Sequence, residues 1–283
     1  MGIKAIAVVG AGTMGSGIAH VAAQSGFEVL LLDRSQEMVE RGLERIGQLL
    51  SRGVDRGLIS EAQKQEALGR VRPAAALADI GPTPLVIEAV FEEFNTKAAL
   101  LRELDALCPA ETILASNTST LPITELAAVT RRPELVVGMH FFNPVYAMRL
   151  VEVIKGYRTA DETVAAAVAV TKELGKTPVV VKDSPGFVAN RLLAPLINEA
   201  AFMLTEGIAS MEDIDTIMKL GANHPMGPLE LADLIGLDVC LHEIETLYRT
   251  LGDSKYRPAL LLKQLVAAGH LGRKTRRGFY EYK

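Results

Sequence analysis

The chain has 283 residues, 49% of them hydrophobic and 23% charged, which is enough for a sizeable core and favours two domains over one. Its 30 basic and 34 acidic residues give a net charge of -4, which argues against non-specific nucleic-acid binding and favours small partners. Cys108 and Cys240 are far apart and outside any metal-ligand spacing, and no signal peptide or run of about 20 apolar residues is evident. We therefore expect a cytosolic protein with no disulfide, no zinc site and no membrane span.

The first half alternates strand-like and helix-like segments. Short runs rich in Val, Ile and Leu, typical of strands, occupy residues 3–9, 27–32, 85–90, 112–115, 135–140, 150–154 and 178–181. Helical periodicity occupies residues 13–25, 37–52, 60–69, 97–107 and 161–174. Because two strands joined by a helix form a parallel unit, the order predicts an α/β fold with a Rossmann-type doubly wound sheet.

After residue 182 the strand-like runs disappear and helical periodicity continues to the end. We expect a helix over residues 185–205, capped by Ser184 and opened by Pro185. Further helices are expected at residues 211–220, 228–248 with a break near residue 236, and 258–268. These patterns predict an α/β domain over residues 1–183 and a smaller all-α domain over residues 184–283.

The net charge conceals a segregation in the last third of the chain. Eleven acidic residues face two basic ones over residues 192–253, whereas eight basic residues face Glu281 alone over residues 254–283. The basic tail therefore either folds back on the acidic helices or meets an anion. Solvated helix faces of different sign are the third interpretation.

A glycine motif lies where the first strand gives way to the first helix. It reads GAGTMG over residues 10–15, and Asp33 closes the second strand 18 residues after Gly15. The first glycine permits the tight turn, the second permits close approach to a pyrophosphate, and the third permits helix–strand packing. The pattern predicts a dinucleotide site made by Gly10, Gly12, Thr13, Met14, Gly15 and Asp33, whose carboxylate should favour NAD over NADP. The alternative is a glycine turn in another kind of α/β protein.

Two ionisable residues interrupt apolar strand runs, His140 and Glu152. Burying either alone would be costly. If the two segments form a hairpin around the Asn143–Pro144 turn with Tyr146 at its centre, each residue lies six positions from that centre and they face one another. A carboxylate on one imidazole nitrogen fixes the tautomer and leaves the other nitrogen to act as a general base or acid. From the pattern alone, a purely structural pair remains open.

The sequence strongly resembles the 3-hydroxyacyl-CoA dehydrogenase family along its full length. The order and spacing of the matching segments agree with the family as well as their residues. These segments are GAGTMG (10–15), VIEAVFE (86–92) with Lys97, ASNTS (115–119), GMHFFNP (138–144) with Glu152, KDSPGF (182–187) with Asn190 and Arg191, and GFY (278–280).

The resemblance implies roles for individual residues. His140 matches the catalytic base, Glu152 its orienting carboxylate, and Ser119 and Asn190 polar contacts near the substrate oxygens. Such donors can polarise an oxygen on which negative charge develops. The positions that match family contacts near the ribose and nicotinamide are Glu92, Lys97, Asn117, Ser119, Asn143 and Lys274. Without the family, Lys97 and Lys274 could equally be solvated side chains.

Two places depart from the family pattern. The basic residues that meet the CoA phosphates in the family are usually lysines, whereas this region offers Arg45, Arg52 and Arg56 as substrate-binding candidates. Arginine can bind phosphate in a bidentate manner, so the function is compatible with the change. In the tail, Arg276 stands where the family commonly has glycine, which affects the local turn and the expected cofactor contact by Lys274.

The resemblance implies an NAD-dependent oxidoreductase that interconverts (S)-3-hydroxybutyryl-CoA and acetoacetyl-CoA. It further implies an acyl-CoA partner, a cleft between the domains as the active site, and a homodimer formed through the helical domain. One alternative is a related dehydrogenase of a free hydroxy acid or sugar acid. The other is a non-catalytic structural protein that binds NAD.

Overall fold

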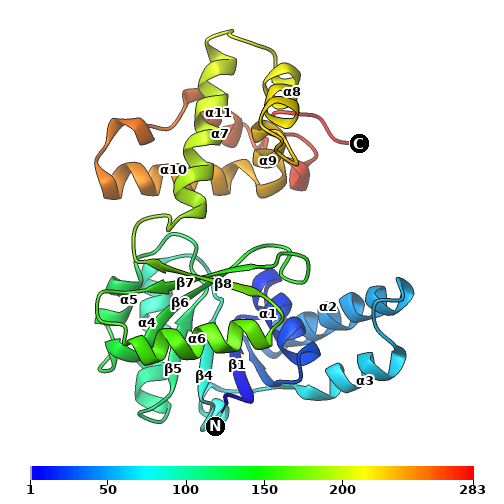
Figure 1. Ribbon diagram of the computed structural model, residues 1–283, viewed down its shortest axis with the longest axis vertical. Helices are drawn as coiled ribbons and strands as arrows, with labels where there is room; N and C mark the ends of the chain where they lie inside the picture. The colour runs from blue at the N-terminus through cyan, green and yellow to red at the C-terminus, as the bar shows by residue number, and fades with distance from the viewer. Residues whose placement is uncertain (1) are drawn as a thin grey trace. The chain divides into compact units, whose positions relative to one another are not determined.

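An eight-stranded sheet forms the N-terminal unit of the computed structural model, which describes residues 2–283 (Figure 1). The strand order is β3-β2-β1-β4-β5-β6-β7-β8. Strands β1 to β6 are parallel, β7 is antiparallel to β6, and β8 is parallel to β7. The first six strands have the order of a doubly wound nucleotide-binding sheet, which confirms the predicted fold class. The strands are β1 (Ala5–Val9), β2 (Glu28–Leu32), β3 (Val71–Pro73), β4 (Leu85–Glu88), β5 (Ile113–Ser116), β6 (Val136–Phe141), β7 (Leu150–Lys155) and β8 (Thr177–Lys182).

Helices follow the strands of this unit in the order that βαβ connections require. α1 carries no charged residue and is buried from Gly15 to Ala23, whereas α2 and α3 start at serine caps, Ser35 and Ser60. α6 packs on β6, β7 and β8, in front of the strands in Figure 1. The short β3 and α5 are elements that the sequence patterns did not predict. The helices are α1 (Thr13–Gln24), α2 (Gln36–Asp55), α3 (Glu61–Arg70), α4 (Phe94–Leu107), α5 (Ile123–Ala128) and α6 (Asp161–Glu173).

The chain divides into two compact units, the first ending at Ser184 and the second running from Pro185 to Lys283. The second unit is helical and has a core of its own, with Ile197, Leu237 and Ile244 almost fully buried. Over residues 2–283, no helix combines the length and the apolar character that crossing a bilayer demands. The helices of this unit are α7 (Ala189–Thr205), α8 (Met211–Gly221), α9 (Pro228–Ile235), α10 (Leu237–Leu251) and α11 (Leu260–Ala267).

The first helix of this unit begins four residues later than the sequence predicts. The expected start at Pro185 is wrong because Gly186 and Phe187 have φ values of 71° and 50°. A right-handed helix needs negative φ, so residues 185–188 form a turn and α7 begins at Ala189. The predicted break near residue 236 is confirmed, since α9 ends at Ile235 and α10 starts at Leu237.

The basic tail folds back on the acidic helices, as one of the three interpretations of the charge segregation predicted. Arg273 pairs with Glu230 at 3.0 Å, and Lys274 Nζ donates to Asp238 Oδ2 at 2.7 Å. Asp233 is 1% exposed and accepts backbone N–H groups of the tail at 2.8 and 2.9 Å. Charge complementarity and a buried carboxylate therefore anchor the last residues of the chain.

The turn that contains Arg276 forms despite its side chain. Arg276 has φ 58° and ψ 12°, the left-handed conformation that glycine adopts without steric cost. Its N–H donates to the Arg273 carbonyl at 3.1 Å, and its own carbonyl accepts from Tyr282 N at 2.9 Å. The arginine is thus accommodated at a conformational cost, and the local turn keeps its hydrogen bonds.

Replacing this arginine with glycine should stabilise the helical unit. Arg276→Gly removes a left-handed penalty of about 1–2 kcal/mol and adds a glycine entropy cost of about 0.5–1 kcal/mol, for a net gain of about 0.5–1 kcal/mol. Urea unfolding followed by circular dichroism measures the gain. The matched control is Arg277→Gly, which removes an ion pair with Glu281 at a residue without positive φ and should give no gain. Equal effects of the two substitutions would contradict the account.

Candidate active site

The carboxyl edge of the parallel strands gathers most of the predicted site residues. Gly10 follows β1 and Asp33 follows β2. Glu88 ends β4, Asn117 follows β5, and His140 lies one residue before the end of β6. Strands that run the same way present their carboxyl ends at one edge, where ligands of open α/β sheets bind. Residues far apart in the chain therefore meet there.

The glycine turn has the geometry of a dinucleotide cradle. Gly10 has φ 106°, and a Cβ on Gly15 would lie 1.6 Å from the Gly10 carbonyl oxygen, so both positions require glycine. A Cβ on Gly12 would meet no atom within 4 Å, so the backbone there is open to close approach. Gly12 caps α1 without a side-chain hydrogen bond, which leaves the first-turn amides of Thr13 and its neighbours to an anion.

Asp33 is tied to the same turn. Its Oδ2 accepts a hydrogen bond from Ala11 N at 2.6 Å, and its Oδ1 accepts from Arg34 N at 2.7 Å. The carboxylate is thereby held beside the glycine turn, where it could accept a hydrogen bond from a ribose hydroxyl. The cradle and the adjacent acid fit an NAD molecule.

His140 and Glu152 face one another across the only antiparallel strand pair described for residues 2–283 of the sheet. They are direct partners in the β6–β7 register, and His140 Nδ1 lies 2.8 Å from Glu152 Oε2. Their side chains are 8% and 3% exposed. A carboxylate at this distance favours the tautomer that carries its hydrogen on Nδ1. The predicted pairing is confirmed as a contact.

Lys97 lies between two carboxylates at the end of β4. Its Nζ is 2.6 Å from Glu88 Oε1 and 3.2 Å from Glu92 Oε2, and the Lys97 and Glu88 side chains are 1% and 0% exposed. Glu88 also accepts from Ser116 Oγ at 2.6 Å and Val90 N at 2.8 Å. Lys97 is therefore no solvated side chain. Its ion pair with Glu88 joins α4 to β4, and the Ser116 hydrogen bond joins β5 to the same carboxylate.

Glu92 organises the turn that carries Ser119. Its Oε1 accepts from Ser119 N at 2.8 Å, Ser119 Oγ at 3.2 Å and Thr118 Oγ1 at 2.6 Å. Burial by itself would raise the pKa of Glu92, but the positive Lys97 and the Thr118 and Ser119 hydrogen bonds outweigh it and lower that pKa. Glu92 thus stays ionised and holds the Ser119 turn at the sheet edge.

The remaining predicted residues fall in different places. Asn117 Oδ1 accepts from Phe141 N at 2.9 Å and so links the ends of β5 and β6. Asn143 is exposed, two residues beyond β6. Asn190 is buried in the first turn of α7 in the helical unit, and Lys274 of the same unit is held by Asp238.

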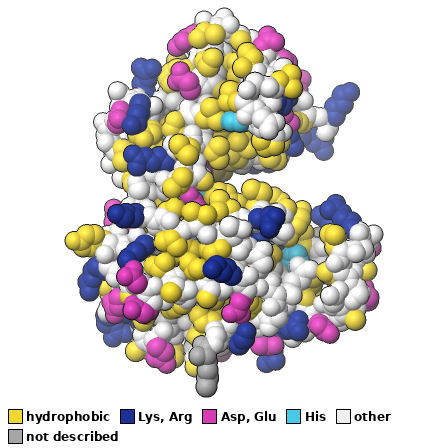
Figure 2. All heavy atoms as spheres, viewed as in Figure 1, with side chains coloured by type: hydrophobic (Ala, Val, Ile, Leu, Met, Phe, Trp, Pro, Cys, Tyr) yellow, Lys and Arg dark blue, Asp and Glu magenta, His cyan; other side chains and the backbone are white. Residues whose placement is uncertain are grey.

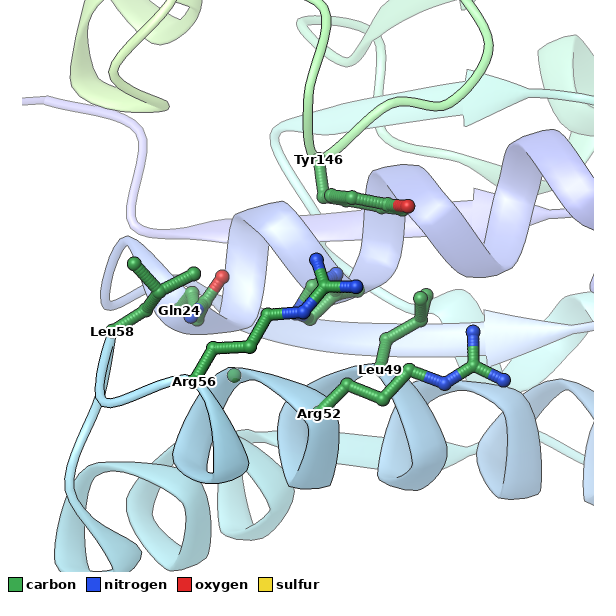
Figure 3. A pocket seen from close by; sticks show the side chains of 8 residues that line it. Gln24, Leu49, Arg52, Arg56, Leu58 and Tyr146 are labelled. Atoms are coloured by element: carbon green, nitrogen blue, oxygen red, sulfur yellow. The ribbon is translucent and has the colours of Figure 1, made fainter.

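The three candidate arginines lie at two different places in the N-terminal unit. Arg45 Nη1 donates to Ser16 Oγ at 3.2 Å, beside the start of α1. Arg52 and Arg56 line a pocket of about 140 Å³ between α1, α2 and the segment after β6, together with His20 and Tyr146. In Figure 3 both arginines extend from α2 and the Tyr146 ring lies over α1. We call this site the α1–α2 pocket.

Sequence patterns missed two groups that shape the site. Glu88 is the buried partner of Lys97, and its signal was an acidic residue at the end of an apolar strand run. His20 lines the α1–α2 pocket, and its signal was a titratable residue among the apolar positions of α1. Neither signal shows what surrounds the side chain, because Lys97 beside Glu88 and the residues that line the pocket with His20 come from other segments of the chain.

Two family models match the chain and together cover nearly all of it. The 3-hydroxyacyl-CoA dehydrogenase NAD binding domain matches residues 5–184. The 3-hydroxyacyl-CoA dehydrogenase C-terminal domain matches residues 186–282.

Individual proteins are similar to this chain over nearly their whole length. A probable 3-hydroxybutyryl-CoA dehydrogenase of Bacillus subtilis (strain 168) is 52% identical over 282 residues, covering 100% of this chain and 98% of that protein. A 3-hydroxybutyryl-CoA dehydrogenase of Bradyrhizobium diazoefficiens is 50% identical and covers 99% of this chain and 96% of its own. The crystal structure of (S)-3-hydroxybutyryl-CoA dehydrogenase from Ralstonia eutropha superposes with a TM-score of 0.96 at 49% identity, covering 99% of both chains.

Removal of the buried lysine should destabilise the N-terminal unit strongly. Lys97→Met leaves Glu88 and Glu92 without their cation, and breaking a buried ion pair costs about 3–5 kcal/mol. Urea unfolding followed by circular dichroism measures the loss. The control is Lys4→Met, which breaks the exposed pair with Glu173 at 3.1 Å and should cost about 1 kcal/mol or less. A Lys97→Met loss no larger than the control's would contradict a structural role for the pair.

Proposed function

The chain belongs to the 3-hydroxyacyl-CoA dehydrogenase family, and from that membership we propose that it interconverts (S)-3-hydroxybutyryl-CoA and acetoacetyl-CoA with NAD as cofactor. The observation that carries the proposal is the buried His140–Glu152 pair, with Nδ1 and Oε2 2.8 Å apart. It lies in the same unit as the glycine turn and Asp33. An acid/base group and a dinucleotide cradle are the two parts that hydride transfer to or from a hydroxyl carbon requires.

His140 moves the proton of the reaction. NAD, when bound, supplies the nicotinamide ring that takes or gives the hydride. In the oxidative direction His140 Nε2 takes the hydroxyl proton of the substrate, and in the reductive direction it returns that proton to the carbonyl oxygen. Glu152 holds the imidazole in one tautomer and offsets the positive charge that forms on it. Glu152 is thus a positioning residue.

Polar and charged groups of the chain account for substrate and cofactor selection. Ser119 and Asn190 are assigned to the substrate oxygens, where a donor stabilises developing negative charge. Arg52 and Arg56 are assigned to the CoA phosphates, because a guanidinium binds phosphate through two hydrogen bonds. Asp33 selects NAD, since its carboxylate would lie against the extra phosphate of NADP.

The residues that match family positions near the cofactor have different neighbours in this structure, and we assign each a role from those neighbours. Asn117 and Asn143 stand at the carboxyl edge of the sheet, next to the predicted nicotinamide position. Glu92 and Lys97 act through the turn they hold and so position Ser119. Lys274 is assigned to the cofactor as well, and its ammonium group is held by Asp238. Arg45 is assigned to a substrate phosphate near Ser16.

A homodimer formed through the helical unit is part of the proposal. Large apolar side chains remain exposed there, and Figure 2 shows hydrophobic atoms over this unit. Leu220 is 83% exposed and Leu192 is 68% exposed. An apolar surface of this kind is typical of a subunit interface. A cytosolic location is also proposed, since Cys108 and Cys240 are buried free thiols, as a reducing compartment would keep them.

Steady-state kinetics test the proposed activity. The purified protein should reduce acetoacetyl-CoA with NADH, and should prefer NADH to NADPH by about tenfold or more because Asp33 opposes the extra phosphate.

His140→Ala should lower kcat by about 10²–10⁴-fold, the range of general acid–base catalysis, with the Kd for NADH unchanged. Glu152→Gln should fall between that variant and the wild type.

Each rival function has its own outcome in that assay. Turnover of free acetoacetate without turnover of the thioester would support the dehydrogenase of a free acid. NADH binding by a folded protein without any turnover would support the non-catalytic alternative. An unchanged kcat in His140→Ala would remove the pair from the mechanism.

Light scattering tests the oligomeric state. The chain mass is 30.4 kDa, and the proposed homodimer should give twice this value in dilute solution. Leu220→Lys should shift the mass toward the monomer, because a charge at the interface core is unfavourable. A wild-type monomer at micromolar concentration would contradict the dimer.

A further inference from the structure

A buried histidine in the α1–α2 pocket has no role in the mechanism above. We propose that His20 is a ligand-binding residue of this pocket, whose imidazole donates a hydrogen bond to a phosphate group of the CoA nucleotide. The inference rests on the proposed function, because it assigns one part of the same substrate. It adds a specificity-determining residue on α1 to the arginines of α2.

The chemistry of the pocket selects an anion. Arg52 and Arg56 line it from α2, and both side chains are exposed at its rim. Among residues 2–283 neither guanidinium forms an ion pair with a carboxylate. Leu58 and Tyr146 supply apolar and aromatic surface beside them. Two unneutralised guanidinium groups next to an aromatic ring suit a nucleotide phosphate better than an acyl chain.

The His20 imidazole lies at the floor of this pocket. The side chain is 4% exposed and lines the cavity. Neither Nδ1 nor Nε2 has a hydrogen-bond partner in the described part of the protein. A buried polar group without a partner is costly, and most such groups in proteins are satisfied. A ligand that reaches the floor of the pocket would satisfy the imidazole.

The charge state of His20 determines what it can offer. Burial, with a smaller contribution from the positive Lys176, lowers the pKa of His20 to about 4. The ring is therefore neutral near pH 7 and carries one N–H donor and one acceptor nitrogen. A phosphate oxygen accepts that N–H, and the charge of the phosphate strengthens the bond.

The segment after β6 is fixed over His20 by close packing. A Cβ on Gly17, one turn before His20, would lie 2.9 Å from Val145 Cγ2, so glycine permits this approach to α1. Lys176 Nζ donates to the Val145 and Met148 carbonyls at 2.6 and 2.7 Å. Tyr146 is held between these two carbonyls, with its ring centroid 6.5 Å from that of His20. The pocket is therefore a built site whose walls come from three separate segments.

Three thioesters that differ only in the nucleotide end test the inference. They are acetoacetyl-CoA, acetoacetyl-3′-dephospho-CoA and acetoacetyl-pantetheine, which lacks every nucleotide phosphate. His20→Phe keeps a planar ring and removes both nitrogens. It should raise the KM for acetoacetyl-CoA by about tenfold or more, as expected for a lost hydrogen bond to a charged group, and leave kcat little changed. The KM for acetoacetyl-pantetheine should stay at the wild-type value.

His20→Phe should weaken substrate binding but stabilise the ligand-free protein. Removing an unpartnered buried polar group should raise the Tm of the ligand-free protein by about 2–4 °C. His20→Gln keeps an N–H donor and should recover part of the KM loss. His242→Gln, at an exposed histidine of α10, is the matched control and should change neither KM nor Tm.

The arms of the experiment separate the possible outcomes. A loss with acetoacetyl-CoA alone assigns the contact to the 3′-phosphate, and a loss shared with the dephospho compound assigns it to the diphosphate. Equal KM increases for all three thioesters, or none, would overturn the inference while leaving the proposed function standing. A wild-type protein that turns over no thioester would overturn the proposed function and this inference together.

Discussion

A buried lysine holds the carboxyl edge of the sheet together. Lys97 Nζ is paired with Glu88 and Glu92, and these two carboxylates in turn accept hydrogen bonds from Ser116, Thr118 and Ser119. The cost of burying the charges of Lys97 and Glu88 is offset only because each has a partner at hydrogen-bond distance. One ion network therefore fixes the end of β4, the start of α4 and the turn after β5, on which the geometry of the candidate site depends.

The direction of one strand decides where the His140–Glu152 pair forms. Parallel strands place their carboxyl ends at one edge, and β7 returns antiparallel to β6, so Glu152 comes back to face His140. In a parallel arrangement these two residues, twelve positions apart, could not be direct partners. Both side chains of the pair are buried, so the contact between them is shielded from water. The hydrogen-bonded register of β6 and β7 therefore sets both the strand direction and the contact between His140 and Glu152.

Local charge matters more than the net charge of -4. The acidic helices and the basic tail neutralise each other within the helical unit, through Glu230, Asp238 and the buried Asp233. The arginines of the α1–α2 pocket lack such partners, although they belong to a nearly neutral part of the chain. The positive charge of this pocket is therefore a local feature that a sum over the sequence conceals.

The sequence by itself determined the doubly wound fold, the two-part organisation, the glycine cradle with Asp33, and the pairing of His140 with Glu152. These features depend on local periodicity, spacing and symmetry about a turn, which neighbouring residues encode. Only the tertiary structure decided that α7 starts at Ala189, that Lys97 is buried between Glu88 and Glu92, and that His20 lies under Tyr146 beside Arg52 and Arg56. A backbone conformation such as φ 50° at Phe187 and a partner distant in the chain leave no periodic signal, because they arise only when separate segments pack together.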